Sequence, residues 1–267
     1  AIRQVGVWVG GKNTPHINNL NKVCEDLAAI NMPLSAVIAY RLTKKELTAL
    51  PDLGTNANPR VSVCIAQDGA GLGAHLQKKL GADKTAITAL GACMGAIARA
   101  KVHESIAWVE KQNLVSTTYV GETGGDIPAD LAKELDVPAL VDGSLMLSLS
   151  NTEIEALNAK RYLFLRKHVG QSGSYWNDSF TADTPESDYA YLENNRTIDK
   201  AVRGIYKALL PHVSGPLRVD SNTGTIALGT ITYLETLAED TLKHMARNGE
   251  LSGFQVIIDP YQSVLGS

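Results

Sequence analysis

The sequence has few aromatic residues, few cysteines and no apolar run long enough to cross a bilayer. Aromatic side chains make up 6% of the 267 residues, so aliphatic side chains must supply most of the core. The three cysteines, Cys24, Cys64 and Cys93, are odd in number, far apart and set in apolar surroundings, which favours reduced, buried thiols over a disulfide framework. The apolar stretch 86–98 is interrupted by Gly and Thr and is shorter than the roughly 20 residues of a membrane span.

Neither sign of charge dominates the sequence. Lys and Arg number 25 and Asp and Glu number 28, so the formal net charge is −3, which argues against a dedicated nucleic-acid binder. The six histidines include no pair with the spacing His-x-x-x-His and no nearby Cys-x-x-Cys, so we predict no metal site. No set of residues forms a recognisable catalytic group, so the residues alone assign no active site and no cofactor.

What the sequence does contain is an alternation of strands and helices. Short apolar runs at 5–9, 35–40 and 61–66 are bounded by glycine or proline and predict strands. Apolar residues at helical spacing predict a helix over 17–28, and a stretch of small residues predicts another over 84–100. Such alternation predicts an α/β fold in which helices cover a parallel or mixed sheet.

The second half of the chain begins with a short helix. Ser150 can cap it, Glu153 lies in its first turn, and it is expected to end at Ala159. Residues 160–168 then alternate as a strand, and Tyr162 and Phe164 are expected on one face. The run Gly-Gln-Ser-Gly that follows, and then Ser-Tyr-Trp, predicts a hairpin.

The remaining sequence predicts two helices and a final strand. Apolar residues recur at helical spacing over 198–209 and over 234–245, and the second helix should end at Asn248 and Gly249. The last strand is expected at 254–258, before Asp-Pro.

One glycine-rich turn offers an alternative function. Residues 68–73, Asp-Gly-Ala-Gly-Leu-Gly, follow a strand and precede a helix, where backbone amides can bind a phosphate. The spacing is Gly-x-Gly-x-Gly rather than Gly-x-Gly-x-x-Gly, and no acidic residue ends a second strand about 20 residues later. A tight turn is the simpler interpretation. The alternative is an α/β enzyme that binds a nucleotide at Gly69–Gly73.

A cluster of basic residues marks the predicted hairpin. Arg161, Arg166 and Lys167 are candidates for a surface that binds an acidic partner protein. A solvated strand end fits the same residues.

The C-terminal half carries a family resemblance. The segment 166–182, Arg-Lys-His-Val-Gly-Gln-Ser-Gly-Ser-Tyr-Trp-Asn-Asp-Ser-Phe-Thr-Ala, with residues 188–189 and 194–203, resembles the contractile tail sheath proteins of phages and prophages. Residues 247–259 are similar to the helix, glycine turn and strand of that family, and residues 98–109 also look like it. The resemblance covers most of the chain.

This resemblance implies a tail-sheath-like core with a structural role. Sheath subunits stack around an inner tube and contract to drive it through an envelope, without nucleotide hydrolysis. The implied partners are identical sheath subunits and the inner tail tube protein. The implied locations are the bacterial host cytoplasm during assembly and then the tail or a tail-like particle. Because family members carry more chain at both ends, we expect residues 1–267 to be a trimmed core of a longer subunit. The change in sequence pattern after Leu147 separately indicates a sub-boundary near 144–151.

The resemblance also suggests where subunits meet. Neighbouring sheath subunits are joined by arms that add strands to another subunit's sheet. We therefore expect the two terminal strands to be sheet edges, although a central strand would fit the same residues. The candidate edge residues are Val5, Val7, Val9, Phe254, Val256 and Ile258.

Overall fold

The structure is a computed structural model, and it describes residues 2–8, 17–80, 87–116 and 133–261. The chain divides into two compact units, Ala1–Asn195 and Arg196–Ser267. Residues 144–151, where a sub-boundary was expected, lie inside the first unit.

Among the described residues, the first unit contains four complete α-helices, three short 3-10 helices and nine short strands. In chain order the elements of both units are β1 (Gln4–Trp8), α1 (Ile17–Ala29), β2 (Ser35–Ala39), η1 (Lys44–Ala49), η2 (Leu53–Thr55), β3 (Ala57–Asn58), β4 (Val61–Cys64), β5 (Ala66–Asp68), α2 (Leu72–Leu80), α3 (Leu90–Arg99), β6 (Pro138–Leu140), η3 (Met146–Ser148), α4 (Asn151–Ala159), β7 (Leu165–Arg166), β8 (Tyr175–Trp176), β9 (Ala182–Asp183), α5 (Leu192–Leu209), η4 (Leu210–His212) and α6 (Leu228–Arg247).

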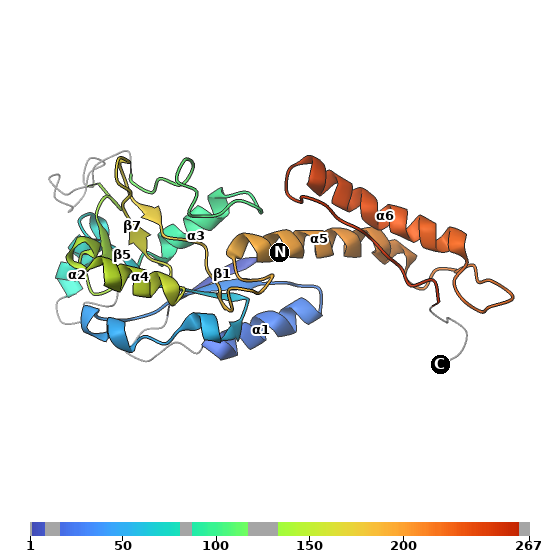
Figure 1. The fold of residues 1–267 in the computed structure, drawn as a ribbon, viewed down its shortest axis with the longest axis horizontal. Helices are drawn as coiled ribbons and strands as arrows, with labels where there is room; N and C mark the ends of the chain where they lie inside the picture. The colour runs from blue at the N-terminus through green and yellow to red at the C-terminus, as the bar shows by residue number, and fades with distance from the viewer. Residues whose placement is uncertain (1, 9–16, 81–86, 117–132, 262–267) are drawn as a thin grey trace. The chain divides into compact units, whose positions relative to one another are not determined.

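A parallel sheet in the order β1-β2-β4 forms the centre of the first unit (Figure 1). The segment after α4 extends this sheet beyond β4, because Leu163 forms a parallel bridge with Cys64. The amide of Ile65 donates to the carbonyl of Leu163 at 2.9 Å, and the amide of Leu163 donates to Val63 at 2.9 Å. Antiparallel pairs β3-β9, β5-β6 and β7-β8 complete a mixed α/β arrangement, so the predicted fold class is confirmed.

The sheet separates two hydrophobic clusters. Along residues 162–165 the side chains alternate between them: Tyr162 and Phe164 belong to the cluster with α1 and α4, and Leu163 and Leu165 to the cluster with α3 and β8. All four side chains are fully buried. The alternation predicted from the sequence is confirmed, although only the last part of the predicted strand forms a ladder, as β7.

Two predicted elements in the middle of the chain differ from the structure. The helix expected over 84–100 is the shorter α3, and a separate helix, α2, whose bounds were not predicted, begins within the glycine-rich turn. The apolar residues of 115–120 are also typical of a strand; residues 115–116 form none, and 117–120 lie outside the described residues. By contrast, α4 begins as expected, because Ser150 and Glu153 form a reciprocal capping box.

The second unit is built from the part of α5 after Asn195, together with η4 and α6. Both predicted helices are confirmed, and α6 ends before Gly249, which has a φ of +70°. The core-facing residues of α6 recur at helical spacing: Ile231, Ala238, Leu242 and Met245. Among the described residues, no helix combines the length and apolarity of a membrane span.

The two helices of the second unit approach closely at Gly204. A Cβ at this position would overlap Cγ2 of Thr241 on α6. We expect Gly204→Ala to lower the stability of this unit by about 1 kcal/mol, because overpacking costs about 1–3 kcal/mol and alanine recovers about 1 kcal/mol of helix propensity. Hydrogen exchange of the α5 and α6 amides measures this change. Adding Thr241→Ser, which removes Cγ2, should restore protection, and a stabilising single Gly204→Ala substitution would contradict the packing.

Candidate functional site

The first candidate surface is the edge strand β1. Among the described residues this strand pairs only with β2, so its other edge leaves backbone donors and acceptors open. The side chains of Val5 and Val7 are partly buried and pack on the hydrophobic cluster, whereas Trp8 is 48% exposed. The valines therefore fix the strand in place, and the backbone is the part available to a partner. Val9 lies outside the described residues.

The second candidate is the segment 254–258. The side chains of Phe254, Val256 and Ile258 are half-buried, and Ile257 is 72% exposed, so the predicted alternation is present. The predicted strand is wrong for the described chain, because no neighbouring backbone forms a ladder with this segment. Its contact with α6 is a hydrogen bond from the amide of Ile258 to Oε1 of Glu235, at 3.0 Å.

Arg161 does not belong to a basic surface, and this prediction was wrong. Its side chain is 3% exposed. Its Nε donates to the carbonyl of Thr181 at 3.1 Å, and a second guanidinium nitrogen donates to the carbonyl of Ala190. The guanidinium also lies 4.6 Å from the ring centroid of Phe180. Arg161 is a structural residue that joins the end of α4 to the 180–190 segment.

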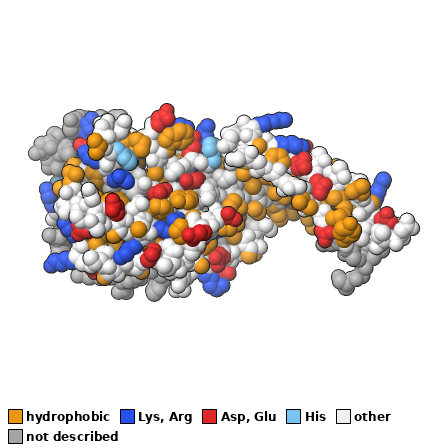
Figure 2. Space-filling view, viewed as in Figure 1, with side chains coloured by type: hydrophobic (Ala, Val, Ile, Leu, Met, Phe, Trp, Pro, Cys, Tyr) orange, Lys and Arg blue, Asp and Glu red, His pale blue; other side chains and the backbone are white. Residues whose placement is uncertain are grey.

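Arg166 and Lys167 do lie at the surface, on the hairpin β7-β8. Gly170 and Gly173 in its turn have φ values of +79° and +101°. Glycine adopts these positive values without steric strain because it has no Cβ. Lys167 is paired with Asp136 at 3.2 Å. The half-buried side chain of Arg166 has no hydrogen-bond or ion-pair partner among the described residues. On the face seen in Figure 2, basic and acidic side chains are interspersed and form no large patch of one sign.

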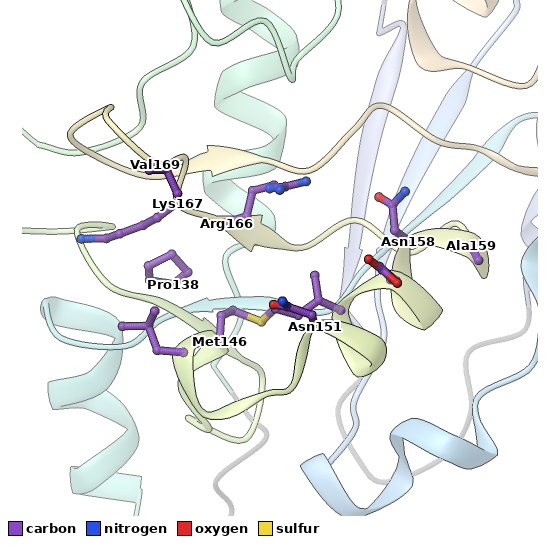
Figure 3. Close-up of a pocket in the computed structure, with 11 residues that line it drawn as sticks. Pro138, Met146, Asn151, Asn158, Ala159, Arg166, Lys167 and Val169 are labelled. Atoms are coloured by element: carbon purple, nitrogen blue, oxygen red, sulfur yellow. The ribbon is translucent and has the colours of Figure 1, made fainter.

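A groove of about 760 Å³ lies between this hairpin and α4 (Figure 3). One wall is the α4 face on which Asn151, Glu155 and Asn158 recur at i, i+4 and i+7. Arg166 and Lys167 form the opposite wall. The sequence analysis singled out the basic residues and missed the groove. The signal was the polar i, i+4, i+7 row on the predicted helix directly before the basic strand.

The floor and flanks of the groove are apolar. Pro138, Met146 and Ile154 line it from β6, η3 and α4. Leu147 is 78% exposed and Val169 is fully exposed, and both lie at its rim. Exposed apolar side chains gathered around a hollow are typical of an interaction site.

His168 reports on the charge of the hairpin. Burial lowers its pKa below the ordinary value, and the positive charge of Arg166 lowers it further. Its ring packs on Tyr175, with centroids 5.3 Å apart. We expect Arg166→Gln to raise the pKa of His168, because it removes the cation, and an NMR titration of the imidazole measures the change. Lys79→Gln on the exposed end of α2 is the control, and an unchanged pKa in Arg166→Gln would refute the coupling.

The glycine-rich turn is closed by its own aspartate. Oδ1 of Asp68 accepts hydrogen bonds from the amides of Ala70 at 3.2 Å and of Gly71 at 3.0 Å. A Cβ at Gly71 would overlap Oδ2 of the same carboxylate. The amides that a phosphate would need are occupied by an internal anion, so the geometry favours the tight turn over the nucleotide site.

The cysteines are buried, free thiols, as predicted. Burial raises the pKa of Cys64 to about 12 and also raises the pKa values of Cys24 and Cys93, so none of them is a thiolate at neutral pH. Within the described ranges, no three His, Cys, Asp or Glu side chains come together as metal ligands.

Both parts of the chain match sequence models of one known family. The sequence model of the N-terminal domain of DUF2586 matches residues 5–180, and that of the DUF2586 C-terminal domain matches residues 188–265. The chain belongs to the DUF2586 family. In this DUF2586 protein, the boundary between the two matched domains and the boundary between the two compact units both lie well after residues 144–151.

The fold of this DUF2586 protein is similar to that of a sheath tail protein. A sheath tail protein from Desulfitobacterium hafniense is 14% identical and superposes with a TM-score of 0.52 over 94% of this chain and 47% of its own. A chain of the anti-feeding prophage baseplate is 15% identical, with a TM-score of 0.43 over 90% of this chain and 53% of its own. This chain thus spans about half the length of each. No curated protein matches it.

Proposed function

We propose that this DUF2586 protein is a non-enzymatic structural subunit of a phage-type contractile tail, a sheath subunit or a close derivative. The observation that carries the proposal is the fold, which a sheath tail protein shares over 94% of this chain. In this role the chain assembles with identical copies around an inner tail tube protein, first in the bacterial host cytoplasm and then in the tail particle. Assembly requires neither a cofactor nor nucleotide hydrolysis.

The second unit supports self-assembly, because apolar side chains remain exposed along α5. Val202, Tyr206, Leu210 and Val213 follow each other at spacings of four, four and three residues, which places them on one side of the helix and its 3-10 extension. They are between 43% and 68% exposed. An apolar stripe of this kind favours contact with another protein surface.

The open edge of β1 and the segment 254–258 also suit an assembly. A strand edge and an extended segment without a ladder are the two halves of strand addition between subunits. We propose that Val5, Val7 and Val9, and Phe254, Val256 and Ile258, belong to such contacts. We also propose that the 267 residues are a core of a longer subunit whose additional chain completes them.

Negative-stain electron microscopy of the chain with its natural flanking sequence, at high concentration, tests the proposal. Tubes or stacked rings are expected. Val202→Asp should abolish them without unfolding the protein, whereas Asn194→Asp, which adds the same charge at an exposed position of α5, should leave them intact. Uniform small particles at all concentrations would refute the structural role.

A further inference from the structure

The groove between α4 and the β7-β8 hairpin contains two hydrogen-bond donors that have no acceptor. The guanidinium of Arg166 is half-buried and unpaired among the described residues, and Nδ2 of Asn158 likewise has no acceptor there. Figure 3 shows Arg166 extending toward the end of α4 that carries Asn158. Lys167, on the same wall, is already neutralised by Asp136. An incoming anion would therefore meet Arg166 first.

The orientation of the Asn158 side chain is fixed by a hydrogen bond from Asn177. Nδ2 of Asn177 donates to Oδ1 of Asn158 at 3.1 Å and to the carbonyl of Tyr162 at 3.0 Å. Oδ1 of Asn177 in turn accepts from the amide of Phe164 at 2.8 Å. Because the oxygen of Asn158 is held by this network, its NH2 group is left as a donor. A fixed amide donor and a guanidinium on the opposite wall together suit a carboxylate.

The rest of the groove suits apolar side chains. Met146 and Ile154 line its floor, and the exposed Leu147 and Val169 extend the apolar surface at its rim. Glu155 projects from the middle of the α4 wall, so a second acidic group on the ligand would meet a like charge. The chemistry selects a segment with one acidic residue among apolar ones.

We propose that this groove binds a short peptide segment of a partner protein, with one carboxylate held by Arg166 and Asn158 and apolar side chains on Met146, Leu147 and Ile154. The groove lies within the first unit, so the proposal goes beyond tail assembly and does not depend on it.

Two capped tetrapeptides test the proposal: leucine-leucine-aspartate-leucine, and the same peptide with asparagine for aspartate. In ¹H–¹⁵N NMR spectra, the aspartate peptide should shift the Nε–H signal of Arg166 and the side-chain amide signals of Asn151 and Asn158. It should bind at least about tenfold more tightly than the asparagine peptide, since a hydrogen bond between charged groups is worth about 1.5–3 kcal/mol. The pKa of His168 should rise on binding, because the carboxylate offsets the charge of Arg166.

Arg166→Gln should remove the preference for aspartate, and Lys79→Gln on α2, which makes the same change of charge, should retain it. The thermal midpoint of Arg166→Gln should be unchanged, because the Arg166 side chain makes no hydrogen bond or ion pair with the residues that the structure describes. A loss of binding at an unchanged midpoint is therefore not unfolding. Equal binding of the two peptides, or shifts confined to other surfaces, would overturn the proposal. Shifts of the Arg166 signal with protein concentration alone would also overturn it, because the occupant would then be a second copy.

Discussion

Replacing Arg161 by methionine is expected to lower the free energy of unfolding of the first unit by about 3 kcal/mol. The substitution fills a similar volume but leaves the carbonyls of Thr181 and Ala190 without their charged donor. It also removes the cation from the ring of Phe180. At about 2–4 °C per kcal/mol, the thermal midpoint should fall by roughly 6–12 °C. Tryptophan fluorescence follows this unit alone, because all three tryptophans lie before Asn195.

Two further measurements distinguish a buried structural role of Arg161 from a role at the surface. Arg166→Met, five residues further on, should cost less than about 1 kcal/mol because the Arg166 side chain has no hydrogen-bond or ion-pair partner in the described part of the chain. Burial raises the pKa of Asp178, while the amide of Ser179 and the charge of Arg161 oppose that rise. Arg161→Met should therefore raise the pKa of Asp178 further. Equal stability losses at Arg161 and Arg166 would show that the buried hydrogen bonds are not important.

Replacing Phe164 by alanine is expected to cost about 3–5 kcal/mol, the usual loss for a fully buried aromatic side chain. Phe164 has no exposed surface and lies in the cluster that joins α1 and α4 to the sheet. Its backbone amide also donates to Oδ1 of Asn177, so a shift of this segment disturbs the groove. Urea denaturation followed by tryptophan fluorescence measures the loss.

The matched control is Val169→Ala, five residues beyond Phe164 on the hairpin. Val169 is fully exposed, and the change should alter stability by less than about 0.5 kcal/mol. Phe164→Leu should lie between the two, because most of the apolar volume remains. A loss below about 1 kcal/mol for Phe164→Ala would mean that the 162–165 segment is not the centre of the core.

Local sequence patterns predicted helices and strands correctly where neighbouring residues alone determine the element. The capping box at Ser150 and Glu153 and the glycine end of α6 depend on neighbouring residues, so the sequence contains them in full. The 162–165 alternation also survived, because both faces of that segment are buried. Residues 254–258 show the opposite case. Their alternation was correct, but a strand also needs a partner, which a local pattern does not supply.

The candidate site was predicted in part. The basic hairpin was found from its charge, and Arg166 and Lys167 are at the surface. Arg161 is not, because it follows α4 with a φ of +65° and turns its side chain toward carbonyls about 20 to 30 residues ahead. Those acceptors become neighbours only in the folded chain. The groove was missed for the same reason, since its floor comes from β6 and η3.

The parallel bridge between Cys64 and Leu163 has a consequence for the growing chain on the ribosome. The strand partner of β4 is encoded about 100 residues later, so synthesis at about 5–20 residues per second leaves that apolar edge open for roughly 5–20 s. Until Leu163 emerges, both hydrophobic clusters lack their shared wall. A nascent chain in this interval presents an edge that a chaperone must cover or that another nascent chain can pair with. Slower translation across this interval is therefore expected to lengthen the time for which the edge of β4 lacks its partner.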